Sequence, residues 1–263
     1  TNTQYNVAVG YNVMFYNTTG DHNTAVGHSA LYSNTIGIYN TAIGRDSIYS
    51  NTTGNFNTAV GWRSLNVNTT GSYNTAIGQQ ALYNNVAGLN ITAVGYQAGF
   101  NNVATNSTLI GMQAGYAASQ YGITAVGYAA LSSNTNGYRN TAVGINAGTL
   151  ITTGTYNTAI GDNTLAVATT YNENTALGAM TLYKLTTGSQ NSGLGSATLY
   201  NLVTGSFNTA VGADSLQTLV TGNNNVAVGY YSMFNTTYSL YNTAVGTSSL
   251  YTNTTGDQNT AVG

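Results

Sequence analysis

Short apolar stretches alternate with polar turn residues along this chain, and the same order returns after a fixed distance. The segment Asn-Thr-Ala-Val-Gly, or a close variant, ends on a glycine at positions 10, 27, 44, 61, 78, 95, 111, 127, 144, 161, 178, 195, 212, 229, 246 and 263. Thirteen of the fifteen intervals between these motif glycines are 17 residues, and the two beside Gly111 are 16. Because self-similarity at a short fixed period is the signature of a repeat architecture, each copy is expected to form one coil.

The repeated unit favours β structure over helix. Its consensus, N-T-A-V-G-x-x-S/A-L-Y-x-N-T-T-G-x-Y, holds two short apolar stretches that lack helical spacing. Its two glycines would each destabilise a helix by about 1 kcal/mol, and the unit is too short for a helix pair or a propeller blade. We therefore predict an all-β fold, a parallel β-solenoid (β-roll) of about 16 coils, each of strand, turn, strand and turn. Neighbouring coils should lie about 4.8 Å apart. Residues 1–263 should form a single repeat domain and a segment of a longer fibre.

Strand alternation predicts which side chains share a face. In Thr-Ala-Val the first and third residues point the same way, and we expect that face to be the core, with the alanine outside. A second apolar column follows four residues after the motif glycine, interrupted by Gly99, Gly115 and Gly148. The cross-section should therefore change near 95–127. The two walls of the predicted core are represented by Val9, Val26, Ile43, Val60, Ile77, Leu31, Leu65, Leu82, Leu182 and Leu199.

Turn residues and asparagines repeat as well. A second glycine in most copies, such as Gly20 or Gly37, stands where the chain must reverse, so we expect it at positive φ. Asparagine stands four residues before the motif glycine in thirteen of sixteen copies. Stacked asparagines can bond amide to amide, so we predict an asparagine column along the coils.

Charged residues make up only 4% of the chain. A charge kept in every coil would face its own copy at about 4.8 Å, at a cost of about 1 kcal/mol per pair in water. Asp46 and Arg63 hold the same register in neighbouring coils, so we predict an ion pair between coils. A net charge of −2 with four basic residues argues against nucleic acid as a partner, and no apolar run is long enough for membrane insertion.

Candidate catalytic groups are few. The two histidines, His22 and His28, fall in different registers, cysteine is absent, and the six acidic residues are scattered. A nucleophile needs a positioned base and oxyanion donors, and no such set is visible. We expect no catalytic site, no cofactor and no metal, and thus no enzyme.

Aromatic residues form the most informative feature. Ten of fifteen complete copies place one directly after the leucine column: Phe15, Tyr32, Tyr49, Tyr83, Phe100, Tyr116, Tyr183, Tyr200, Phe234 and Tyr251. A second partial column lies five residues before the motif glycine. Adjacent strand residues point oppositely, so the ten should face outward and exceed the apolar patch of a usual monomer. Burial between parallel copies of the chain, contact with a sugar or receptor, and local cover by a turn all remain open.

The motifs also resemble known repeats. Asn-Val-Ala-Val-Gly at 6–10 and Asn-Thr-Ala-Ile-Gly at 40–44 resemble head repeats of trimeric autotransporter adhesins. The longer unit at 23–35 resembles repeats of bacterial and phage tail-fibre-like proteins, although the coil is longer than the adhesin head repeat. This resemblance implies a parallel β-roll in a three-fold fibre, displayed on a cell surface or virion and used for attachment.

We therefore expect an extracellular structural or adhesive fibre segment, a rigid shaft or head. Its partners should be further copies of itself, as a homotrimer, and a surface glycan or host receptor. A self-assembling filament is the alternative, because open solenoid ends expose strand edges that template addition. Ice binding by threonine ranks is disfavoured, because adjacent Thr18 and Thr19 point to opposite faces and no T-x-T array appears.

Overall fold

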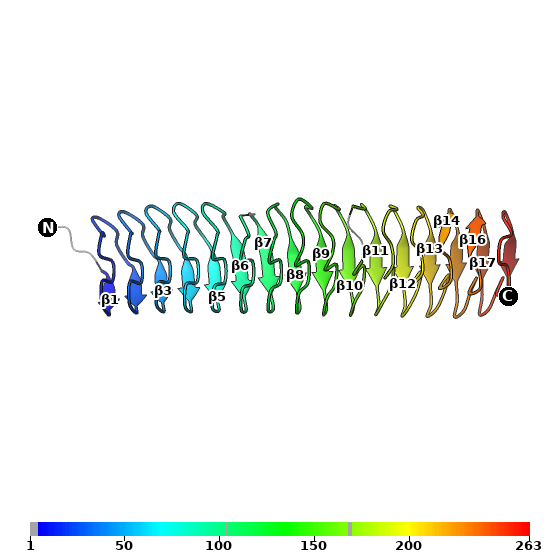
Figure 1. The fold of residues 1–263 in the computed structure, drawn as a ribbon, viewed down its shortest axis with the longest axis horizontal. Coiled ribbons are helices and arrows are strands. Elements are labelled where there is room, and N and C mark those ends of the chain that lie inside the picture. The colour runs from blue at the N-terminus through cyan, green and yellow to red at the C-terminus, as the bar shows by residue number, and fades with distance from the viewer. Residues whose placement is uncertain (1–4, 104, 168–169) are drawn as a thin grey trace. The chain divides into compact units, whose positions relative to one another are not determined.

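A computed structural model describes residues 5–103, 105–167 and 170–263 of the chain. The chain is a parallel β-solenoid of about sixteen turns spaced by 17 residues, and its described residues contain no helix (Figure 1). This confirms the predicted fold class. The chain divides into two compact units, Thr1–Thr135 and Asn136–Gly263.

The first unit stacks its strands in chain order. Each strand pairs in parallel with the next, and residue n lies beside residue n + 17, as in Val7 beside Thr24. The register shortens to 16 between the two longest strands, where Ile91 lies beside Ser107. The strands are β1 (Val7–Val9), β2 (Thr24–Val26), β3 (Thr41–Ile43), β4 (Thr58–Val60), β5 (Thr75–Ile77), β6 (Ile91–Val94), β7 (Ser107–Ile110) and β8 (Thr124–Val126).

The second unit repeats this stack and adds a small sheet. Its main strands are β9 (Thr141–Val143), β10 (Thr158–Ile160), β11 (Thr175–Leu177), β12 (Ser192–Leu194), β13 (Thr209–Val211), β15 (Val226–Val228), β17 (Thr243–Val245) and β18 (Thr260–Val262). The small sheet pairs β14 (Thr221–Asn223) with β16 (Tyr238–Leu240), also in parallel. Every motif strand of this unit thus lies against the equivalent strand of the neighbouring coil.

From β2 onward the side chains alternate along the motif strands as predicted, but in the opposite phase, whereas all three residues of β1 are exposed. The middle residue points inward: Ala25, Ala42 and Ala59 are fully buried. The predicted core residues on either side of it lie outside, with exposed fractions of 56% for Val9, 40% for Ile43 and 40% for Ile77, while Val26 and Val60 are half-buried. The placement of Val9, Val26, Ile43, Val60 and Ile77 in the core is therefore wrong.

Volume explains the inverted phase. The other predicted wall is confirmed, because Leu31, Leu65, Leu82, Leu182 and Leu199 are all fully buried. These leucines fill the interior of a narrow coil, so the facing strand has room for a methyl group only.

One coil shows this exchange of volume directly. Leu109 replaces the inward alanine, and glycines replace the leucine in the two neighbouring coils. A Cβ atom at Gly99 would lie 2.7 Å from Leu109 Cδ1, and one at Gly115 would lie 2.5 Å from Leu109 Cδ2. The predicted change near 95–127 is therefore a swap of large and small residues across the core.

The leucine wall is a series of turns and not the predicted second strand. Leu31 has φ 52° and Ser29 has φ 53°, a left-handed conformation that costs a non-glycine residue about 1–2 kcal/mol. The wall still bonds from coil to coil: the Leu31 N–H donates to Ser47 O at 3.0 Å, and the Ser33 N–H to Tyr49 O at 3.0 Å. Inter-coil hydrogen bonds and leucine burial hold this conformation in place.

The two repeated glycines also differ from expectation. Positive φ belongs to the motif glycine, for example 127° at Gly44, where a Cβ would lie 2.6 Å from Gly61 O. The second glycine is needed for close approach instead: a Cβ at Gly37 would lie 2.6 Å from Gly54 O. The prediction of positive φ at the second glycine is wrong for Gly20, Gly37 and most of their equivalents, with Gly188 an exception at 150°.

Candidate functional site

The buried asparagine column is present as predicted. The backbone N–H and the side-chain Nδ2 of Asn57 both donate to Asn40 Oδ1, at 3.0 and 3.1 Å. Asn57 Nδ2 also donates to Gly71 O at 2.8 Å, and Asn57 Oδ1 accepts from the N–H of Asn74 at 3.1 Å. Each amide therefore satisfies backbone groups of the chain reversal that the strands cannot reach.

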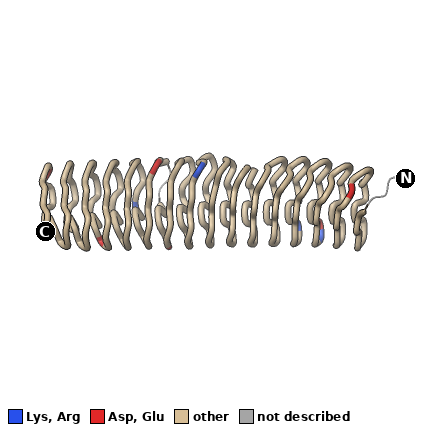
Figure 2. The backbone as a smooth tube through the Cα atoms, turned by 180° about the vertical axis from the view of Figure 1, so that it is seen from behind, with Lys and Arg blue, Asp and Glu red and all other residues tan. Residues whose placement is uncertain are grey.

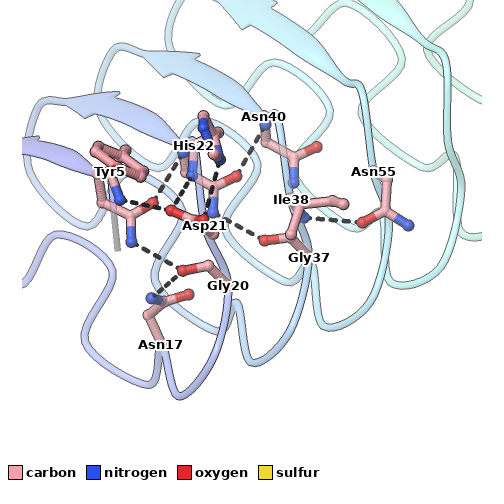
Figure 3. Close-up of polar contacts among 11 residues, drawn as sticks. Tyr5, Asn17, Gly20, Asp21, His22, Gly37, Ile38, Asn40 and Asn55 are labelled. Carbon is pink, nitrogen blue, oxygen red and sulfur yellow. Dashed lines mark hydrogen bonds and ion pairs between the residues drawn. The ribbon is translucent and has the colours of Figure 1, made fainter. Parts of the chain in front are cut away.

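A second polar column lies two residues earlier, and sequence reasoning missed it. The Ile38 N–H donates to Asn55 Oδ1 at 2.8 Å (Figure 3). The Asn55 N–H donates in turn to Ser72 Oγ at 2.9 Å. Its signal in the sequence is the frequent Asp, Asn or Ser six residues before the motif glycine. These short polar side chains suit a turn because they accept bonds from nearby backbone N–H groups.

Asp21 holds the same corner position near the first strand. Its Oδ1 accepts from the Tyr5 N–H at 2.5 Å, and its Oδ2 lies 3.0 Å from His22 Nδ1 (Figure 3). The hydrogen bond from the Tyr5 backbone is the main cause that lowers the pKa of the Asp21 carboxyl below its ordinary value, with the His22 contacts adding to it. This carboxylate ties together two neighbouring coils.

The predicted aromatic residues after the leucine column lie at the surface and stack on one another. Ring centroids are 4.9 Å apart for Tyr32 and Tyr49, 5.1 Å for Tyr83 and Phe100, and 5.3 Å for Tyr183 and Tyr200, with interplanar angles of 3–7°. We call this set the first aromatic column. Inside a run, both faces of a ring contact neighbouring rings, so only edges and hydroxyl groups meet solvent. A sugar that needs a free ring face could stack only where a run ends.

A second, partial aromatic column lies five residues before the motif glycine. It runs through Tyr5, His22, Tyr39, Phe56 and Tyr73, with centroid distances of 4.7–5.1 Å. His22 therefore serves as one ring of the stack.

A charged cluster surrounds Asp46. The predicted pair is present, with Arg63 Nε 3.5 Å from Asp46 Oδ2, and Arg45 Nε lies 3.4 Å from the same oxygen. His28 Nδ1 is 4.0 Å from Asp46 Oδ1. Charges are otherwise sparse along the backbone (Figure 2). Ion pairs with exposed arginines contribute about 0–1 kcal/mol each to stability. The cluster therefore stabilises the fold little, and its charged groups are of interest as candidate ligand-binding groups.

The outer face of the motif strands is a regular apolar surface, which we call the sheet face. Threonine lies beside threonine and valine beside valine or isoleucine from coil to coil, as in Thr24 beside Thr41 and Val26 beside Ile43. None of the strands β1 to β18, which lie in the described part of the chain, contains a charged residue. In each unit the sheet face presents two parallel ranks, one of hydroxyl and methyl groups and one of branched apolar side chains.

Neither a metal-binding cluster nor a membrane-spanning helix occurs in the part of the chain that the structure describes. Residues 5–103, 105–167 and 170–263 hold no group of three or more His, Cys, Asp or Glu that could bind a metal ion. Over the same ranges no helix has the length and apolar character to cross a membrane. No protein-family model matches the chain, and no curated protein matches its sequence.

Proposed function

We propose that the chain is a structural and adhesive fibre segment, a shaft or head, that assembles as an extracellular homotrimer on a cell surface or virion. The observation that carries the proposal is the sheet face, which repeats the same apolar ranks in successive coils of each unit. The resemblance to adhesin heads and tail-fibre repeats supports three copies and attachment. No catalytic role forms part of the proposal.

The sheet face is unusual for a parallel sheet. Parallel sheets are normally covered on both faces, whereas only the alanine side is covered here. The exposed Val and Ile rank extends through successive coils, and contiguous apolar patches of that extent mark interaction sites.

A further copy of the chain is the occupant that fits this face best. Only a surface with the same step of about 4.8 Å can place an equivalent group opposite every coil. The face carries no charge, so parallel copies meet no column of like charges there. The core of such an interface would be apolar and depleted of charge, as homo-oligomer interfaces are.

Substituting lysine for valine on the sheet face tests whether a further copy of the chain binds there. We expect wild-type chain to sediment as a trimer and to appear as a three-chain fibre in transverse views by electron microscopy. The triple variant V26K/V60K/V94K should sediment as monomer, because its lysines point outward and would be desolvated at the interface. The matched control T19K/T53K/A87K changes exposed turn residues and should remain a trimer. A wild-type monomer at micromolar concentration would contradict the proposal.

Two other functions stay testable in the same experiments. The inverted strand phase places a threonine rank on a regular outward face, which favours ice binding as a second candidate. A monomer that shows thermal hysteresis, lost in V26K/V60K/V94K, would support it over the trimer. Filaments that lengthen with concentration would instead support end-to-end stacking.

A further inference from the structure

A hollow of about 310 Å³ opens in the first unit where the first aromatic column is interrupted. Asn66 stands at the position that an aromatic ring takes in the coils before and after it. The hollow is lined by His28, Asp46, Tyr49, Arg63, Asn66 and Tyr83, together with Ser29. It therefore combines ring walls with the charged cluster around Asp46.

The two tyrosines form facing walls. Tyr49 stacks on Tyr32 at 4.9 Å, and Tyr83 stacks on Phe100 at 5.1 Å, so each is the last ring of its run. The other face of each ring is directed toward the gap. The two walls are separated by two coil steps, about 10 Å, and in an uninterrupted run one ring fills this space. The gap is therefore one ring thick.

The polar groups lie at the side of this gap. Asn66 does not fill it, because its Nδ2 turns to donate to the backbone oxygen of Asp46 at 2.8 Å. The Asp46 carboxylate can accept hydrogen bonds from hydroxyl groups, and the Arg63 guanidinium, 3.5 Å from it, can donate them. A guest with an apolar ring face and a hydroxylated rim satisfies both kinds of surface.

Other gaps in the first aromatic column lack this combination. Gln217 lies between Tyr200 and Phe234, but its Nε2 already donates to Asp214 Oδ1 at 2.5 Å. A hollow of about 320 Å³ at Thr149 has no charged residue in its lining. Among the described residues, the gap at Asn66 thus offers two ring faces together with a carboxylate and a guanidinium that face it.

We propose that this hollow binds one hexopyranose ring between Tyr49 and Tyr83, with hydroxyl groups bound by Asp46 and Arg63. The inference rests on the attachment role proposed above and names the ligand class. Stacking on tyrosine faces supplies apolar contact, and charge-assisted hydrogen bonds orient the ring. Rings inside the stacked runs offer edges only, and other run ends, such as Tyr200 beside Gln217, lack a carboxylate and a guanidinium that face one gap, so we expect binding at this gap.

Saturation-transfer NMR on the full chain tests the site. Methyl β-D-galactopyranoside and methyl β-D-glucopyranoside serve as sugar probes, and p-cresol serves as a flat aromatic probe. We expect at least one glycoside to bind. Asn66→Tyr should abolish binding by filling the gap, and Asp46→Asn should weaken it about tenfold or more. Gln217→Tyr, which fills a different gap with the same residue, should leave binding unchanged.

Three outcomes would overturn the assignment: no glycoside binding up to about 50 mM, where a millimolar site would be saturated; binding of p-cresol alone; or an equal loss in Asn66→Tyr and Gln217→Tyr. Circular dichroism of each variant verifies that the fold is kept. Sedimentation separates this proposal from the fibre proposal. A trimer that binds no glycoside would contradict only the sugar site, and a monomer that binds one would contradict only the trimeric fibre.

Discussion

Replacing Asn57 with leucine would remove one amide from the middle of the buried asparagine column. The change deletes the Nδ2 bonds to Asn40 Oδ1 at 3.1 Å and to Gly71 O at 2.8 Å. It also leaves the N–H of Asn74 without its acceptor at 3.1 Å. Two lost bonds at about 1 kcal/mol each and one orphaned buried N–H at about 1–3 kcal/mol exceed the gain from burying leucine. We expect the free energy of unfolding to fall by about 3 kcal/mol.

Asn68 offers a matched control in a different column. Its Oδ1 is buried without a hydrogen-bond partner, while its Nδ2 donates to Asn51 Oδ1 at 2.9 Å and to Gly71 O at 3.1 Å, and Gly71 O keeps its bond from Asn57 when Asn68 is replaced. Asn68→Leu therefore exchanges one unsatisfied oxygen for another. Equivalent coils already carry a buried leucine at this position, as at Leu185 and Leu202. The expected loss is about 1 kcal/mol, because one buried oxygen replaces another and leucine burial offsets part of the lost bonds.

Urea unfolding followed by circular dichroism measures both variants. With a slope of about 3 kcal/mol/M, Asn57→Leu should lower the midpoint by about 1 M and Asn68→Leu by about a third of that. Amide hydrogen exchange should show faster exchange at Asn74 in Asn57→Leu alone. If the two variants are equally stable, or if Asn74 keeps its protection, the asparagine column does not support the backbone as described.

Three further predictions follow from the packing and the pKa. Leu109→Ala should lower the free energy of unfolding by about 2–5 kcal/mol in urea, because neighbouring Gly99 cannot fill the cavity; a loss below about 1 kcal/mol would contradict the volume swap. Gly44→Ala should cost more than about 3 kcal/mol, since φ is 127° and a Cβ would press on the next coil's carbonyl; an unchanged midpoint would refute this. Because folding lowers the pKa of Asp21, its stabilisation is present above the ordinary aspartate pKa of about 3.9 and is lost as pH falls through the lower folded value. The protection factor of the Tyr5 amide, the exchange rate of the unfolded chain divided by that of the folded protein at the same pH, should therefore fall in acid, and Asp21→Asn should remove that pH dependence; equal pH dependence of protection in both proteins would argue against the bond.

Much of the architecture could be predicted because it depends on spacing alone. A 17-residue period without helical spacing leads to a parallel solenoid, and identical register places Asn40 beside Asn57 and Asp46 beside Arg63. The buried leucines also follow from their column. These features need only the rule that equivalent residues stack from coil to coil.

Other features could not be predicted from the sequence and became visible only in the tertiary structure. Alternation shows that Thr24 and Val26 share a face, but not which face is inside; the leucines decided that by leaving room for Ala25 only. The left-handed φ of Leu31 could not be predicted, because an apolar residue in a repeat is equally compatible with a strand. The hydrogen bonds between coils impose the left-handed conformation.

The sequence by itself determined the period, the fold class and the neighbours of each residue along the stack, since these follow from repetition. Tertiary structure decided which ranks face solvent and where the aromatic column opens into a hollow at Asn66. The physical reason is that the register alone decides which residues stack on one another. Which face of a strand is buried, and where a hollow opens, depends instead on the volumes of the side chains that meet.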